Sequence, residues 1–513
     1  METHATLPHR ALLLAALTGS LVVSSVASAQ QGAPGAAPPP APGAAPAVAP
    51  MPFQMPAAAA DPIAIALAPK AGGLTAEEAA KVVSQTKHSV RSKQADLRAA
   101  AAKVDQAMVA YFPRLSVGAS YQYLSPVNLN FSNALALKPN TPPAIASAFA
   151  AEFQYVSPII LPVNNYALTA SINVPVSDYF FRLCQGYAAA SHSEKSARLS
   201  ADAEALQAGA DAKISYFNWV QARGAIVVAR EAIAQSKAHL EDAKKSFAVG
   251  LASRADVLRI DAQVAAAQQA EAESIAFASV AEEQLRILLA TPADKSLEIG
   301  SDVLNEPAVP PAETLAALQD VALARRLELR ALDETIYSLK QVEAATAAGY
   351  FPRIDAFGDA TYANPNQRIF PSSPVWTGTW DAGVRLSWTL NDTFTTLGAT
   401  AEARARTAGL IEQKGAIRDA LRTEVASAYA DALKAPPTIE AADRGMISAE
   451  ESLRVRRELF RNGKATSSEL VDAEAELTSA RLRRLNAHVG QLVARARLDH
   501  ATGRDAPAKP VAE

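Results

Sequence analysis

Cysteine is almost absent from this sequence of 513 residues: Cys184 stands alone, which excludes a disulfide framework and a zinc site made of several cysteines. The net charge of −3 gives no sign of nucleic-acid binding. Aromatic residues make up only 6%, while alanine is abundant, which favours long helices over a compact enzyme core. Beyond the N-terminus, no stretch has the roughly 20 consecutive apolar residues of a membrane helix. A chain of this kind that crosses a membrane must therefore do so as strands.

Signatures of catalysis are missing as well. Neither a nucleophile elbow nor a phosphate-binding loop occurs. The histidines of the predicted helices are scattered without the spacing of a zinc site, namely His88, His192, His239, His488 and His500. We therefore expect no enzyme, no bound metal and no cofactor.

The N-terminus has the pattern of an export signal. A weakly basic start at His9 and Arg10 precedes the apolar run Leu12 to Val26, and residues 27–29 (Ala-Ser-Ala) form a small-residue cleavage site. Residues 1–29 are thus predicted to be a signal peptide. Residues 30–72, rich in Ala, Pro and Gly, are predicted to be a disordered linker, and residues 505–513 a disordered tail.

Most of the chain is a duplicated unit. The stretch "YFPRL" at 111–115 returns as "YFPRI" at 350–354, an offset of 239 positions (353 − 114). Asp178 corresponds to Asp392 at an offset of 214 (392 − 178), and Gly250 to Gly463 at 213 (463 − 250). The first repeat is predicted over residues 73–300 and the second over 301–504. Each has the order helix, strand, strand, long helix, turn, helix.

The predicted helices are unusually long. Leu183–Val249 and Thr395–Asn462 would each be on the order of 100 Å, and Pro436-Pro437 is expected to break or kink the second. Helices of about half that length precede the strands and follow the turns, so that two of them, end to end, match one long helix. They are Thr75–Ala110, Thr314–Gly349, Ser253–Leu289 and Thr466–Thr502, the last with a coiled-coil seam of Leu470, Ala473, Leu477 and Ala480.

Four segments alternate apolar and polar residues over ten or more positions, enough for a tilted strand to cross a bilayer. A soluble half-buried sheet alternates in the same way, but the export signal and the aromatic residues near the segment ends favour a membrane. Strands in lipid must close on themselves, and the smallest barrels have about eight strands, so four strands per chain predict an obligate oligomer. The segments are Arg114–Tyr123, Tyr166–Val176, Arg353–Tyr362 and Trp376–Leu390, and their membrane junctions are Tyr111, Pro113, Tyr350 and Pro352.

From about Gly73 to Gly503, the chain resembles the TolC-like family of outer-membrane efflux proteins. The two junctions, the duplication and the turns "FAVGLASRADVL" and "FRNGKATSSELVDAEAEL" carry the resemblance. It implies an α+β membrane protein, a homotrimer that shares a twelve-stranded outer-membrane barrel continued by a long periplasmic tunnel of helices. It also implies export of drugs, small molecules or proteins, in efflux or type I secretion, with a periplasmic adaptor and an inner-membrane pump as partners.

The helical turns are the predicted functional sites. Gly250 and Gly463 should end helices, and the segments 253–256 and 466–469 have the spacing of capping boxes. The caps are Ser253, Asp256 and Thr466. By the resemblance, the adaptor is contacted by Val249, Gly250, Leu251, Asn462, Gly463 and Lys464.

Glu469 and Asp472 lie on one helix face, and by the resemblance they ring the narrow periplasmic entrance; the alternative is a solvated helix face. The first repeat has Arg259 in place of Asp472. At the positions of the family's polar latch the chain has Phe460 and Ala465, which puts that latch in doubt, although Lys464 could pair with a neighbouring acid.

A periplasmic coiled-coil adaptor or scaffold is the alternative function, because such proteins also contain long helical hairpins. Adaptors carry globular β-domains and usually an inner-membrane anchor, and the paired alternating strands argue against them. The sequence leaves open the exported substrate, the pump class, the adaptor and whether the loop Ser125–Asn165 plugs or shields the outer mouth.

Overall fold

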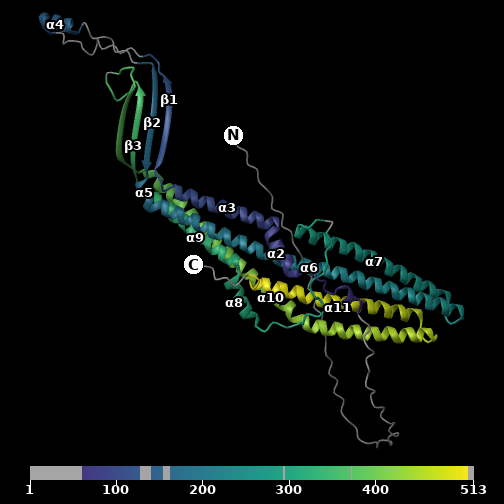
Figure 1. Ribbon diagram of the computed structural model, residues 1–513. Coiled ribbons are helices and arrows are strands. Elements are labelled where there is room, and N and C mark those ends of the chain that lie inside the picture. The colour runs from purple at the N-terminus through teal and green to yellow at the C-terminus, as the bar shows by residue number, and fades with distance from the viewer. Residues whose placement is uncertain (1–60, 127–139, 154–161, 293–294, 371, 507–513) are drawn as a thin grey trace, which may run out of the picture. The chain divides into compact units, whose positions relative to one another are not determined.

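The computed structural model describes residues 61–126, 140–153, 162–292, 295–370 and 372–506. The expected signal peptide, most of the expected linker and most of the expected tail lie outside these residues. A helical body and one β-sheet make up the described chain (Figure 1). Short elements flank them: α4 (Pro143–Phe153) within the predicted loop 125–165, α5 (Val176–Asp178), the π-helical η2 (Tyr179–Leu183) and the 3-10 helix η3 (Ala348–Tyr350).

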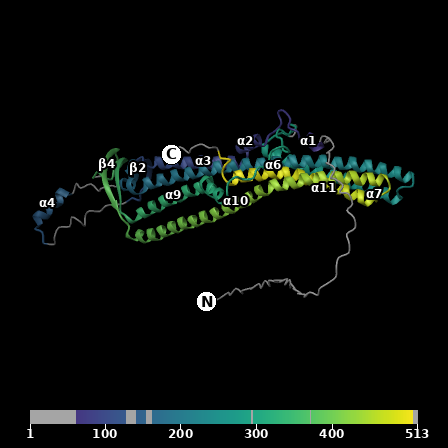
Figure 2. The same cartoon turned by 90° about the horizontal axis from the view of Figure 1, so that it is seen from below.

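Two long helices organise the helical body: α6 (Cys184–Ala248) has 65 residues and α10 (Leu390–Arg461) has 72. At 1.5 Å per residue each is about 100 Å long, as predicted. Shorter helices pack along both halves of each long one, which confirms the predicted pairing of two half-length helices with one long helix (Figures 1 and 2). These are α3 (His88–Val109) and α7 (Arg254–Leu289) on α6, and α9 (Leu327–Ala347) and α11 (Ser467–Ala501) on α10.

The first helix of each repeat was predicted to be continuous, and this is wrong in both repeats. A single extended residue separates α2 (Ala76–Thr86) from α3, and another separates α8 (Leu315–Arg325) from α9. The two residues, Lys87 and Arg326, are repeat equivalents at the offset of 239 (326 − 87). Each break directs a cation at the neighbouring long helix, where it meets an acid.

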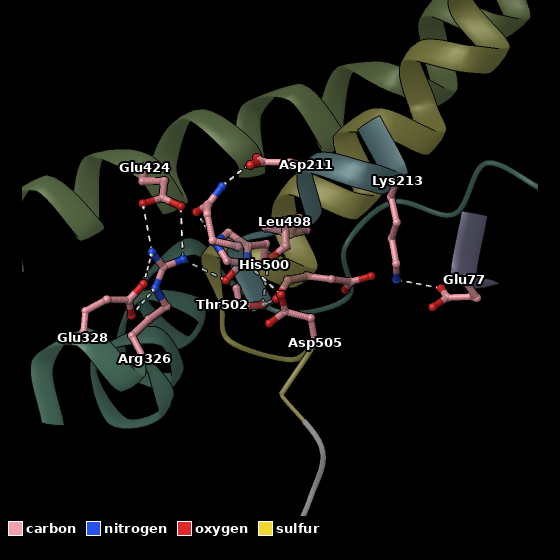
Figure 3. A network of polar contacts seen from close by, with 12 residues as sticks. Glu77, Asp211, Lys213, Arg326, Glu328, Glu424, Leu498, His500, Thr502 and Asp505 are labelled. Carbon is pink, nitrogen blue, oxygen red and sulfur yellow. Dashed lines mark hydrogen bonds and ion pairs between the residues drawn. The ribbon is translucent and has the colours of Figure 1, made fainter. Parts of the chain in front are cut away.

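The ion pairs at the two breaks also correspond. Lys87 Nζ lies 3.0 Å from Asp211 Oδ2, and an Arg326 guanidinium nitrogen lies 3.2 Å from Glu424 Oε1. Arg326 is buried, pairs in addition with Glu328 and donates to the carbonyl of His500 at 2.9 Å (Figure 3). Because a buried guanidinium without partners is costly, this network fixes the direction in which α8 meets α9.

Pro436 and Pro437 were expected to break or kink the second long helix. The prediction of a break is wrong. The helix α10 is assigned without interruption from Leu390 to Arg461. Two prolines remove two backbone hydrogen bonds, but the flanking side chains of Ala435 and Ile439 are buried. Tertiary packing on both sides of the prolines therefore outweighs the local loss.

The expected linker ends earlier than predicted, because residues 61–72 belong to the folded unit. Asp61 caps the short helix α1 (Pro62–Ala66) by accepting a hydrogen bond from the amide of Ile63 at 3.0 Å. Ile63 and Leu67 are buried in the main apolar core. These two apolar residues, one in α1 and one at its C-terminal cap, stand among Ala and Pro residues that favour a linker.

The sheet has the order β1-β2-β3-β4, and every pairing is antiparallel. The first strand, β1 (Arg114–Tyr123), has the predicted bounds. The other strands differ from their predicted bounds by one to three residues at one or both ends: β2 (Asn164–Val174), β3 (Arg353–Asn364) and β4 (Thr377–Ser387). Both edges of this sheet, β1 and β4, have no strand partner among the described residues.

One face of the sheet is apolar and exposed. In register, Leu115 faces Ile172, and Ile354 faces Leu386, so most of the large apolar side chains of the four strands share that face. Phe357 is an exception: it lies on the other face, where the guanidinium of Arg385 covers its ring. Val384 and Trp380 are 72% and 77% exposed. The other face carries Arg353, Asp355, Asp359, Asp381 and Arg385, as the alternation predicts. Among the described residues, no helix is both long enough and apolar enough to span a membrane.

Because the sequence predicts that the apolar face contacts lipid, Val384→Asp should destabilise the protein, by up to about 2 kcal/mol near the bilayer midplane, and Leu386→Asp, closer to the end of β4, should do so by less. Ser387→Asp, on the polar face, should be mild. Folding free energies measured in phospholipid vesicles would compare the two faces. Equal losses at both faces would show that the orientation of the strands has been misread.

Candidate functional site

The two helical turns, α6 to α7 and α10 to α11, have the same backbone geometry. Gly250 and Gly463 adopt φ of 78° and 67°, a region that favours glycine. The next residue donates back into the helix: Leu251 N to Ser246 O and Lys464 N to Leu459 O, both at 2.8 Å. These are Schellman motifs, and they confirm both predicted helix ends.

The helix starts after the turns differ between the repeats. Ser253 and Asp256 form the predicted capping box. Thr466 accepts from the amide of Glu469, but the carboxylate of Glu469 does not return to the backbone of Thr466. It pairs instead with Arg456 on α10, so the second predicted capping box is wrong. A guanidinium within reach outcompetes a backbone amide for a carboxylate.

Asp472, one turn beyond Glu469, is exposed, and no ion pair or hydrogen bond to its side chain is found within the described residues. The two acids therefore have different surroundings: Glu469 forms an ion pair with Arg456, and Asp472 faces solvent. The predicted adaptor-contact residues Val249 and Leu251 are 70% and 58% exposed at the first turn. Lys464, Gly463 and Asn462 are exposed at the second.

Polar contacts tie the first hairpin (α6 and α7) to the second (α10 and α11) near these turns. Asp242 on α6 accepts from both Arg457 and Arg461 on α10, with closest distances of 3.2 and 2.8 Å. Burial acts to raise the pKa of Asp242, but the hydrogen bonds from Arg461 and Arg457 outweigh it and hold the pKa below its ordinary value. The Ser467 hydroxyl donates to Asp256, and this contact is the main cause that lowers the pKa of that carboxyl.

The two residues at the expected latch positions, Phe460 and Ala465, belong to an apolar cluster between the helices. Phe460 is buried, and Ala465 packs against the same cluster, which also contains the predicted seam residues. All four of these, Leu470, Ala473, Leu477 and Ala480, are buried. No acid pairs with Lys464 among the described residues, so the suggested Lys464 contact is not found; Arg457 and Arg461 link the hairpins instead.

A buried histidine and a buried glutamate face each other between the hairpins. His239 Nε2 on α6 lies 3.2 Å from Glu474 Oε1 on α11, and both side chains are less than 5% exposed. Ser236 donates to Glu474 Oε2 at 3.1 Å. Burial lowers the pKa of His239 to about 4, helped by the charge of Arg457, and raises the pKa of Glu474 to about 7.

The spacing of the histidines in the sequence excludes a zinc site but does not predict their carboxylate partners. Three others also face carboxylates: His192 and Glu334 at 2.6 Å, His500 and Asp505 at 2.7 Å, and His488 and Asp443 at 3.6 Å. The carboxylate partners lie on other helices or, for Asp505, in the predicted tail. No spacing of residues within a helix therefore predicts these pairs. No group of three or more metal-ligating side chains occurs in the described part of the chain.

The four predicted junction residues lie where helices meet the sheet. Tyr111 and Pro113 precede β1, and Tyr350 and Pro352 precede β3. The hydroxyl of Tyr179, just after β2, donates to the carbonyl of Tyr111 at 2.6 Å. This contact links the segment that enters β1 to the segment that leaves β2.

The comparisons with known proteins agree with this architecture. The family model described as outer membrane efflux protein matches residues 81–291 and 318–504. No curated protein matches the chain. Among solved structures, the chain is similar to the outer membrane protein VceC from Vibrio cholerae, at 16% identity, with 83% of this chain and 96% of that chain covered and a TM-score of 0.66.

Two further solved structures share the fold. The Campylobacter jejuni CmeC outer membrane channel matches at 13% identity, over 88% of this chain and 94% of that chain, with a TM-score of 0.66. The open state of the Neisseria gonorrhoeae MtrE outer membrane channel matches at 17% identity, over 83% and 88%, with a TM-score of 0.65. At such identities the likeness concerns the fold.

The buried pair predicts a pH dependence of the contact between the hairpins. A raised pKa at Glu474 contributes stability that is present below pH 4.5 and lost as the pH rises through about 7. A lowered pKa at His239 contributes stability that is present above pH 6.5 and lost as the pH falls through about 4. The contact should therefore be strongest at about pH 5 to 6, between these windows.

Hydrogen exchange of the α6 amides around His239, measured from pH 5 to 8, tests this dependence. Exchange rates must first be corrected for their intrinsic pH dependence. Glu474→Gln should flatten the loss of protection above pH 6, while Glu476→Gln, at an exposed position two residues further on, should leave it unchanged. A loss that persists in Glu474→Gln would assign the titration to another group.

Proposed function

The chain belongs to the outer membrane efflux protein family, and we propose that three copies of it form the complete channel and share one barrel. The protein is an outer-membrane exit channel for efflux, with its strands in the outer membrane and its helices extending into the periplasm. The exported substrate enters at the helical turns and leaves through the barrel.

The observation that carries the trimer is the open sheet. Four strands with one exposed apolar face cannot close, and both edge strands present unpaired backbone groups. In hydrocarbon such groups cost several kcal/mol each. Three chains supply twelve strands, an even number within the range of known membrane barrels.

Around the threefold axis of the proposed trimer, Glu469 and Asp472 of all copies ring the periplasmic entrance. Within each copy Arg456 offsets part of the charge of Glu469, whereas no ion pair to Asp472 is found among the described residues. The attraction of the ring for cations should therefore come mainly from Asp472. Contacts such as Asp242 with Arg457 and Arg461 hold the two hairpins of each copy together beside this ring.

The tips are the proposed docking site for a periplasmic adaptor, which in turn joins an inner-membrane pump. Exposed apolar side chains at the first turn, Val249 and Leu251, lie beside exposed backbone at Gly250. The second turn adds Asn462, Gly463 and Lys464. Because glycine has no side chain, a helical hairpin of an adaptor can approach the backbone of the turn closely and contact the exposed apolar side chains beside it.

Mass measurement of the purified complex in detergent should give three chains and no folded monomer. The channel should dissociate only together with loss of its strand structure, because an isolated four-stranded sheet leaves its edges unpaired. A stable folded monomer in the outer membrane would contradict the shared barrel.

The acid ring predicts a cation-selective channel that multivalent cations block from the periplasmic side. Asp472→Ala with Glu469→Ala should largely remove block by a trivalent cation in planar bilayers. Asp472→Ala alone should weaken block more than Glu469→Ala alone, since Arg456 already offsets Glu469. Asp256→Ala, a cap at the other turn, should alter tip stability and leave block intact; unchanged block in the double variant would locate the constriction elsewhere.

A further inference from the structure

Within one chain, a hydrogen bond and an ion pair join the two repeats. They form where β2 leaves the sheet and β3 enters it. Ser177 is buried, and its hydroxyl accepts a hydrogen bond from the amide of Ile354 at 3.0 Å. Beside it, the guanidinium of Arg353 lies 3.8 Å from the carboxylate of Asp178.

Both halves of this contact occur a second time, at the two open edges of the sheet. The segment before β1 repeats the entry of β3, so that Arg114 and Leu115 correspond to Arg353 and Ile354. The segment after β4 repeats the exit of β2, so that Asn391 and Asp392 correspond to Ser177 and Asp178. Asparagine, like serine, offers a side-chain oxygen that accepts from a backbone amide.

The edge copies are more exposed than the internal ones: Leu115 is 73% exposed and Ile354 38%, and Ser177 is buried whereas Asn391 is exposed. Arg114, Leu115, Asn391 and Asp392 are all exposed, and no ion pair to Arg114 or Asp392 is found among the described residues. In one chain they lie on opposite edges of the sheet, so they cannot meet each other. A second copy of the chain brings the missing partner to each edge.

We propose that neighbouring copies join by repeating the internal junction: Arg114 of one copy pairs with Asp392 of the next, and Leu115 N–H donates to Asn391. This proposal rests on the shared barrel described above and specifies its subunit interface. Arg353 has a second acid, Asp355, at 2.9 Å. Arg114 has Ser116 at that position and so depends on the neighbouring copy for its carboxylate.

The same reasoning fixes the register between β4 and β1 of the next copy. Inside the chain, Ile172 faces Gly358; shifted by the repeat offsets of 214 and 239, this pair becomes Leu386 facing Ala119. Both of these residues belong to the apolar face. A slip of one residue would pair the apolar face with the polar one, so the nearest competing registers differ by two residues.

Disulfide cross-linking in the assembled channel tests this register. In a Cys184→Ser background, Leu386→Cys is combined with Ala119→Cys, and in control variants with Val117→Cys or Tyr121→Cys. Direct cross-strand neighbours lie about 5 Å apart between Cβ atoms and diagonal ones about 7 to 8 Å. Oxidation should give several-fold more covalent trimer with Ala119→Cys than with either control.

Each outcome separates the register from the trimer itself. Stronger cross-linking in a control would overturn the register while the trimer stands. No cross-link in any variant, with a trimer by mass, would overturn the edge pairing. Absence of a trimer in the Cys184→Ser parent would overturn the proposed function as well.

Charge reversal tests the ion pair. Arg114→Asp and Asp392→Arg should each lower the temperature at which the trimer dissociates in detergent by several degrees, and the two together should recover most of the loss. Arg114→Asp combined with Asp178→Arg is the matched control, because these positions belong to different junctions and should not rescue each other. Equal recovery in both combinations, or recovery in neither, would overturn the pairing.

Discussion

Unpaired backbone at a sheet edge is the constraint on which this molecule depends. In a bilayer no water satisfies the amides and carbonyls of β1 and β4, so the sheet must be completed by other strands. Short segments join the strands to the helices: Tyr-Phe-Pro-Arg leads into β1 and β3, and only one or two residues separate β2 from α5 and β4 from α10. The spacing of strands in the membrane therefore also sets the spacing of the helices beneath them. A closed barrel and a helical tunnel are two consequences of one requirement.

The chain builds this architecture from a duplicated unit, and the two repeats share some contacts and differ in others. The kink of the first helix and its ion pair are kept, as Lys87 with Asp211 and as Arg326 with Glu424. Such contacts set backbone direction, which both repeats need. At the turns the repeats diverge: Arg259 stands opposite Asp472 in the alignment of the two units. The second acid beyond the turn is therefore present in the second repeat and replaced by a cation in the first.

The two hairpins meet through a mixture of small apolar residues and buried polar groups. A seam of leucine and alanine brings the helices close, and Asp242 and the pair His239 with Glu474 occupy the same interface. Buried polar groups of this kind add little net stability, and removing one partner is costly. They favour one alignment of the hairpins over others, and in that alignment the acids of α11 lie beside the helix turn.

The sequence by itself determined the strands, the long helices, the glycine turns and the duplication, because alternation, helical composition and turn residues are local signals. It also determined the family, through Tyr-Phe-Pro-Arg and the paired turns in their order. Tertiary structure decided the rest. Packing of Ala435 and Ile439 stabilises α10 across two prolines. Burial of Ile63 and Leu67 in the core makes the end of the expected linker part of the folded unit. The partners of Glu469, His239 and Asp242 lie on other helices, and no pattern along the chain encodes contacts between side chains that only folding brings together.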